Sequence, residues 1–78
     1  MGVSPFSYIN SVSQAAVRDS KVFLEASEGN FDESDLDSSI EEDLRFRGFL
    51  ESAKDYYETI YRASVDLYLT LSEDQDED

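Results

Sequence analysis

The chain has no cysteine, no histidine and no tryptophan among its 78 residues. Without cysteine it cannot form disulfides or thiolate metal sites, and without histidine it lacks the commonest metal ligand and the usual general base. A chain this short buries a small core and often gains stability by oligomerisation or by binding a partner. These absences indicate a protein that is not an enzyme and holds no cofactor or metal.

Long apolar runs are also missing. No stretch of about 18 apolar residues could cross a membrane, and no basic and then apolar leader resembles a secretory signal. The chain begins MGVSPF, with Phe6 where a myristoylation signal needs serine or threonine. We therefore expect a soluble, cytoplasmic protein.

Basic residues are scarce, and the charge is unevenly distributed. Six lysines and arginines face 19 carboxylates, for a net charge of −13. Residues 25–78 hold 18 of those carboxylates and four basic residues, whereas residues 1–24 are almost neutral. Such a field repels nucleic acids and anionic membranes and attracts basic surfaces over roughly a Debye length, about 8 Å at physiological salt. The sequence therefore predicts a basic protein surface as partner, with no direct contact to nucleic acid or membrane.

The first helix is predicted over residues 5–27. Ser4 and Pro5 match an N-cap followed by proline at the first helical position, and Val3 and Tyr8 could form the hydrophobic staple. Apolar residues then recur at helical spacing, and Gly29 suits the left-handed position after a helix.

A second, longer helix is predicted to begin near residue 39. Residues 28–37 are rich in carboxylates and favour a loop, which lacks the glycine and terminal glutamate of a calcium-binding loop. Ser38 and Ser39 each precede a glutamate by three residues, as in a capping box. No polar turn residues surround Gly48, so we expect a kink there and not a break.

The end of the chain allows two interpretations. Apolar and polar residues alternate over residues 63–72 as in a half-buried strand, but this chain offers no sheet to join, so we favour helix. Residues 73–78 are predicted to be a disordered acidic tail after a single domain over residues 1–72.

These elements predict an all-α antiparallel helical hairpin with a long second helix. Its last third would leave an apolar stripe uncovered, with Ile60, Leu67 and Leu71 as the interface residues. A second copy could cover this stripe and form a dimeric four-helix bundle. The alternative is a compact three-helix monomer with a break at Gly48.

Carboxylates one helical turn apart, about 5–6 Å, approximate the spacing of phosphates on DNA. Small phage antirestriction proteins that mimic DNA are likewise short, helical and strongly acidic, and the chain resembles them in kind, although it shares no alignable motif with them. The resemblance implies an inhibitor that blocks a nucleic-acid-binding protein. The candidate residues of the acidic face are Asp37, Glu41, Glu51, Asp55, Glu58 and Asp66.

The acidic composition is also compatible with two roles that involve no mimicry of DNA. The protein could be a small acidic assembly, scaffold or adaptor factor that acts through its apolar C-terminal helix. The charge could also be an adaptation to a high-salt cytoplasm, where it aids solubility and recognises nothing.

Overall fold

Three α-helices make up the protein. The computed structural model describes residues 5–76, with side chains as far as residue 72. The helices are α1 (Pro5–Ser27), α2 (Glu33–Arg47) and α3 (Glu51–Asp76), and the described residues contain no strand. The all-α prediction is confirmed, and the elements are those of the three-helix alternative and not those of a hairpin.

Helix α1 has the bounds that its sequence predicted. Its proposed N-cap and staple partner, Ser4 and Val3, lie outside the described residues. At the other end Glu28 and Gly29 both have positive φ, of 55° and 76°, and the Gly29 amide donates to the Leu24 carbonyl at 3.2 Å. Gly29 therefore ends α1 as expected, because glycine enters this region without a Cβ penalty.

The expected loop over residues 28–37 is wrong in its second half, because α2 begins at Glu33. Asp32 is the N-cap: its side chain accepts from the Asp35 amide at 2.9 Å, and the Asp35 side chain accepts from the Asp32 amide at 3.3 Å. The carboxylates that suggested a loop thus stabilise the positive end of a helix. Ser38 and Ser39, the predicted caps, lie inside α2.

The prediction that one helix continues through Gly48 is also wrong. Gly48 has φ 67° and ψ 37°, and its amide donates to the Leu44 carbonyl at 3.1 Å, so it caps α2. Arg45 and Arg47 occupy the last turn of α2, where cations favour the negative end of the helix dipole. The chain then reverses, and α3 begins at Glu51.

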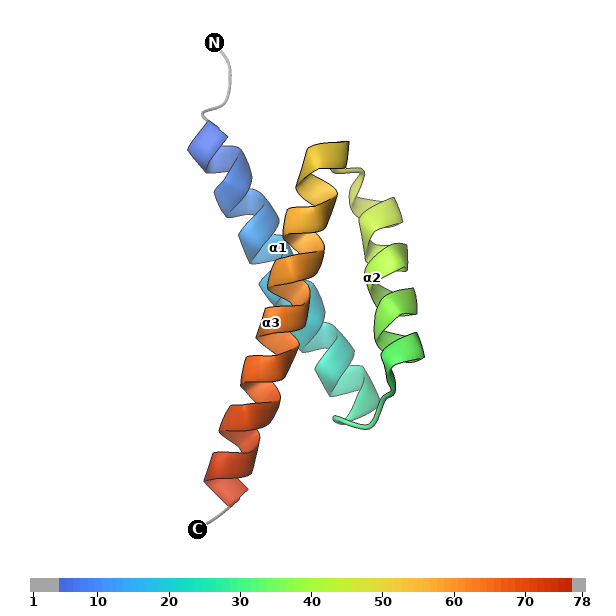
Figure 1. Cartoon of the computed structure of the whole chain (residues 1–78), viewed down its shortest axis with the longest axis vertical. Coiled ribbons are helices and arrows are strands. Elements are labelled where there is room, and N and C mark those ends of the chain that lie inside the picture. Colours follow the sequence, from blue (N-terminus) through green and yellow to red (C-terminus); the bar gives the residue numbers. More distant parts are fainter. Residues whose placement is uncertain (1–4, 77–78) are drawn as a thin grey trace.

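The helices pack as a crossed pair with a third helix on one side. In Figure 1, α1 and α3 run in the same general direction and cross near their middles, and α2 runs back beside them. The main packing is between α1 and α3, and α2 packs more lightly on α3. The small side chains Ala15 and Ala16 are buried on α1, which suits close approach of two helices. The sequence predicted an antiparallel hairpin of residues 5–27 with one long helix, whereas in the structure α1 packs on α3, which runs in the same general direction.

The core contains residues from all three helices. Tyr57 and Tyr61 of α3 are fully buried at its centre. Around them lie the other buried hydrophobic residues, Val12, Ala15, Ala16, Leu24, Leu36, Ile40, Ala53 and Val65.

Residues 63–72 are helical, so the strand interpretation is wrong and the favoured one is confirmed. The helix backbone continues to Asp76, and residues 77–78 lie outside the described part, so the division into a domain and a disordered tail stays a prediction. The far ends of α1 and α3 diverge from the crossing (Figure 1). As a result the radius of gyration is 13.8 Å, against about 11.5 Å for a compact domain of this length.

Candidate protein-binding site

The negative charge lies on two of the three helices. Helix α1 has as many basic residues as carboxylates, whereas α2 has six carboxylates and two arginines. Helix α3 has seven carboxylates, one lysine and one arginine. The six candidate residues of the acidic face all belong to α2 or α3.

The structure gathers three carboxylates around one arginine between α2 and α3. The Arg62 guanidinium donates from Nη1 to Glu33 at 2.6 Å, from Nε to Glu58 at 3.0 Å and from Nη2 to Asp37. We call Glu33, Asp37, Glu58 and Arg62 the Arg62 cluster. Hydrogen bonds to Glu33 and Glu58 raise the pKa of Arg62, so its guanidinium stays charged throughout the experimentally accessible pH range. The cluster keeps a net charge of −2 and joins α2 to α3.

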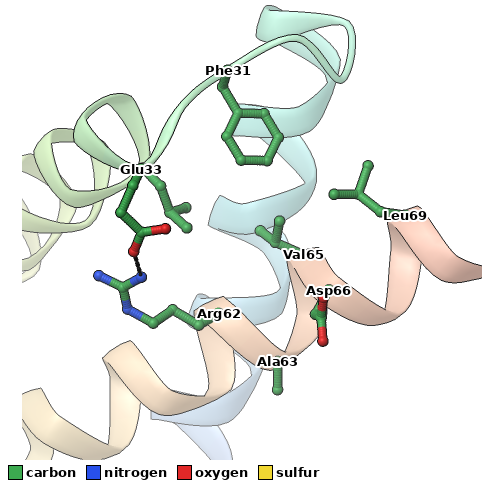
Figure 2. Close-up of a pocket in the computed structure, with 8 residues that line it drawn as sticks. Phe31, Glu33, Arg62, Ala63, Val65, Asp66 and Leu69 are labelled. Atoms are coloured by element: carbon green, nitrogen blue, oxygen red, sulfur yellow. Dashed lines mark hydrogen bonds and ion pairs between the residues drawn. The ribbon is translucent and has the colours of Figure 1, made fainter.

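A shallow groove of about 390 Å³ opens beside the Arg62 cluster. Figure 2 shows the Phe31 ring pointing toward Val65 and the Glu33 carboxylate meeting the Arg62 guanidinium. Phe31 precedes the α2 N-cap and Leu36 is the fourth residue of the helix, the two positions of a hydrophobic staple. The groove therefore combines an apolar wall with a charged rim. Its lining residues are Phe31, Glu33, Leu36, Arg62, Ala63, Val65, Asp66 and Leu69.

The structure brings together some of the predicted acidic residues and not others. Asp37 and Glu58 meet in the Arg62 cluster, and Asp66 lies at the edge of the groove. On α3 the spacings of Glu51, Asp55, Glu58 and Asp66 place them along one side of the helix, and Glu51 forms an ion pair with Lys54 at 3.4 Å. Glu41 is exposed one turn after Asp37 on α2.

Glu58 and Arg62 are four residues apart on one helix, so their pair could be found from spacing alone, whereas Glu33 was not among the predicted residues. The missed signal was the N-terminal position of Glu33 on α2, which the loop prediction hid.

A second polar network joins all three helices inside the fold. Asp19 of α1 accepts from Arg47 of α2 at 3.0 Å (Nε) and 2.8 Å (Nη2), and from the Tyr57 hydroxyl of α3. Burial raises the pKa of Asp19, but the hydrogen bonds from Arg47 and Tyr57 outweigh it, so this pKa lies below its usual value of 3.8. Asp43 stands four residues before Arg47 on α2, but Arg47 pairs with Asp19 of another helix. The network is structural, since it fixes the helices relative to one another.

The hydroxyls of the two core tyrosines form their contacts inside the fold. The Tyr57 hydroxyl donates to Asp19, and the Tyr61 and Ser39 hydroxyls lie 2.9 Å apart. Burial raises the pKa of Tyr61 to about 12 and raises that of Tyr57 further. Every buried polar side-chain atom of the described residues has a hydrogen-bond partner.

Of the three predicted apolar interface residues, two are uncovered. Leu67 is 60% exposed and Leu71 is 53% exposed, whereas Ile60 is half-buried against the core.

Comparison of the chain with protein-family models, curated proteins and solved structures found no match. Within residues 5–76 no group of histidine, cysteine, aspartate and glutamate residues could hold a metal ion. Over the same residues, no helix has the length and apolar character needed to cross a membrane.

Proposed function

We propose that the protein is a non-catalytic binding protein that engages a basic surface of a partner protein through α2 and α3. The observation that carries this proposal is the separation of charge: most of the exposed carboxylates lie on these two helices, whereas α1 has equal numbers of basic and acidic residues. A one-sided field orients an approaching basic partner and raises the association rate more than it deepens the affinity.

The groove beside the Arg62 cluster also supports the proposal, because its residues suit the binding of one basic side chain of the partner. Its apolar wall can cover the aliphatic stem of a lysine or arginine from the partner, while Glu33 and Asp66 lie where the cation would be. Arg62 already occupies part of this charged rim. An incoming cation would share or replace Arg62 as the partner of Glu33.

The proposed partner is a nucleic-acid-binding protein, and the proposed role is inhibition by DNA mimicry in the cytoplasm, in the style of phage and mobile-element proteins. Glu51, Asp55 and Glu58 follow at spacings of four and three residues, about one helical turn, or about 5–6 Å, apart. Such a row can occupy a groove that otherwise holds phosphates.

The experiment compares two variants that each lose three negative charges at exposed positions. One replaces Glu41, Asp55 and Asp66 of the acidic face by the corresponding amides. The matched control replaces Glu25 of α1, Glu28 of the following turn and Glu42, which lies about 100° around α2 from Glu41. Binding is measured by fluorescence anisotropy with a labelled arginine-rich peptide, and with purified DNA-binding proteins in the presence of competing duplex DNA.

The acidic-face variant should lose roughly 1–3 kcal/mol of binding free energy, or about five- to 150-fold in Kd, and the control variant much less. Equal losses in the two variants would show that only net charge matters and would contradict a defined site. A partner that binds this protein and its DNA at the same time would contradict mimicry.

A second candidate function rests on the exposed Leu67 and Leu71. An acidic assembly or adaptor protein would contact its partner through this apolar part of α3, and high salt would then leave binding almost unchanged. Salt should weaken binding to the acidic face steeply, so a salt titration separates the two functions. A helix content that rises strongly between dilute buffer and molar salt would instead favour a high-salt adaptation.

A further inference from the structure

Helix α2 is attached to the fold by less apolar packing than the other two helices. Leu36 and Ile40 are the buried residues among its 15, whereas the main packing of the fold is between α1 and α3. A segment that buries few apolar side chains opens at a lower free energy than the rest of a fold. The attachment of α2 therefore depends strongly on its polar contacts.

Two arginines make the main polar contacts that hold α2. Near its start, Glu33 and Asp37 accept hydrogen bonds from Arg62 of α3. At its last residue, Arg47 donates to Asp19 of α1. The Arg62 and Arg47 side chains are 33% and 32% exposed, so water competes for both contacts. We call them the two arginine contacts of α2.

The charges of α2 and α3 oppose the packing of these two helices. Helix α2 has six carboxylates and two arginines, a net charge of −4, and α3 has seven carboxylates, one lysine and one arginine, a net charge of −5. Helices of like charge repel one another over roughly a Debye length, about 8 Å at physiological salt. Arg62 offsets this repulsion locally, because it pairs with carboxylates of both helices (Figure 2).

Short turns that contain glycine connect α2 to its neighbours. Residues 28–32 precede the helix and residues 48–50 follow it. Gly29 and Gly48 have φ of 76° and 67°, and no atom lies within 4 Å of a Cβ placed on either residue. Glycine changes its backbone angles more easily than other residues, so both turns can act as hinges. Because α2 lies beside the crossed pair of α1 and α3 (Figure 1), it can move outward without separating them.

Helices α1 and α3 also share contacts that do not involve α2. The Tyr57 hydroxyl donates to Asp19, and the hydroxyls of Tyr56 and Ser13 lie 2.9 Å apart. Val12 of α1 is buried and lines the same small cavity as Tyr56 of α3. These contacts can persist when α2 leaves its place.

We propose that α2 opens and closes as a unit on its two glycine turns while α1 and α3 stay packed. The two arginine contacts and the hydrogen bond between the Ser39 and Tyr61 hydroxyls hold the closed form. Opening takes Glu33 and Asp37 away from α3, so the complete Arg62 cluster exists only in the closed form. A basic partner that contacts α2 and α3 together therefore holds α2 closed, a consequence that rests on the proposed function.

The test is hydrogen exchange of backbone amides followed by mass spectrometry, with rates corrected for the intrinsic exchange of each peptide. In the unmodified chain, residues 37–46 of α2 should exchange at least about tenfold faster than residues 12–24 of α1 and 53–65 of α3. Equal protection in all three helices would overturn the proposal. The measurement uses the free protein, so the opening of α2 and the binding of a basic partner can fail separately.

A pair of variants tests the arginine contacts. Arg62→Gln removes one of them and should speed the exchange of α2 by about two- to tenfold. Arg45→Gln is the matched control, because it removes the same charge from an exposed position of α2 that belongs to neither contact. An equal effect of the two variants would show that net charge and not the contact holds α2 closed.

Val12→Ala distinguishes the opening of α2 from unfolding of the whole chain. Val12 is buried on α1, so this truncation weakens packing that the open form keeps. Exchange of α1 and α3 should therefore become faster, whereas exchange of α2 should stay the same. If α2 accelerates as much as the other two helices, it opens only when the whole fold unfolds, and the proposal is wrong.

Discussion

The hydroxyl of Tyr57 should contribute measurably to stability, and its removal tests the interior network. Tyr57 is fully buried, and its hydroxyl donates to the Asp19 carboxylate. Tyr57→Phe keeps the ring in the core and removes this one hydrogen bond. A hydrogen bond to a charged group contributes about 1.5–3 kcal/mol. Asp19 keeps its two hydrogen bonds from Arg47, and its side chain is 15% exposed, so water can replace part of the loss.

We therefore expect Tyr57→Phe to lower the free energy of unfolding by about 1–2 kcal/mol, which corresponds to a fall in Tm of roughly 5–15 °C. The assay is urea and thermal unfolding followed by circular dichroism at one fixed protein concentration. Tyr56→Phe is the control, because Tyr56 is the preceding residue, is 38% exposed and has its hydroxyl in a solvent-exposed contact with that of Ser13. It should change stability by less than about 0.5 kcal/mol. Equal stability of the two variants would refute the structural role of the Asp19 network.

Three further predictions concern pH, the Arg62 cluster and the turn after α2. Because the pKa of Asp19 is below 3.8 in the fold, the ionised carboxylate stabilises the protein at neutral pH, and this effect is lost as the pH falls below about 3.8. In urea unfolding, Asp19→Asn should therefore lower the free energy of unfolding less at about pH 3 than at neutral pH. Arg62→Gln leaves three carboxylates facing one another and should lower the free energy of unfolding by about 0.5–1.5 kcal/mol in dilute buffer and by less in molar salt. The same loss of stability in both buffers would contradict an electrostatic origin. Gly48→Ala should cost about 1 kcal/mol through its positive φ alone, because no atom lies within 4 Å of the added Cβ; a stability gain on urea unfolding would show that the left-handed cap does not persist in solution.

Sequence reasoning succeeded where one local signal dominated. The apolar periodicity of α1 and the glycine after it were sufficient to place Pro5–Ser27. It failed over residues 28–48, where each residue type fits two structures. Asp32 and Asp35 are typical of loops and also cap helices, and Gly48 can be tolerated inside a helix or can end one. The two arginines in the last turn of α2 were a usable signal for the second outcome, because cations favour a helix C-terminus.

The candidate site was predictable in its chemistry and not in its geometry. The sequence identified an acidic segment and the pair of Glu58 with Arg62, four residues apart on one helix. Glu33 and Asp37 reach the same arginine from α2, at separations of 29 and 25 residues. No periodicity within one helix encodes such a contact, because it depends on how α2 packs beside α3.

The sequence by itself determined the helical class, the charge imbalance and the absence of thiol or imidazole chemistry, because these follow from residue types and from spacing within a single helix. Tertiary structure decided which helices pair, which carboxylates gather around Arg62 and which apolar residues stay exposed. Asp19, Arg47 and Tyr57 show the reason: they belong to three different helices, and their contact exists only after those helices have packed. Leu67 is apolar like the core residue Val65, two positions earlier, and only the path of α1 across α3 leaves Leu67 on the surface.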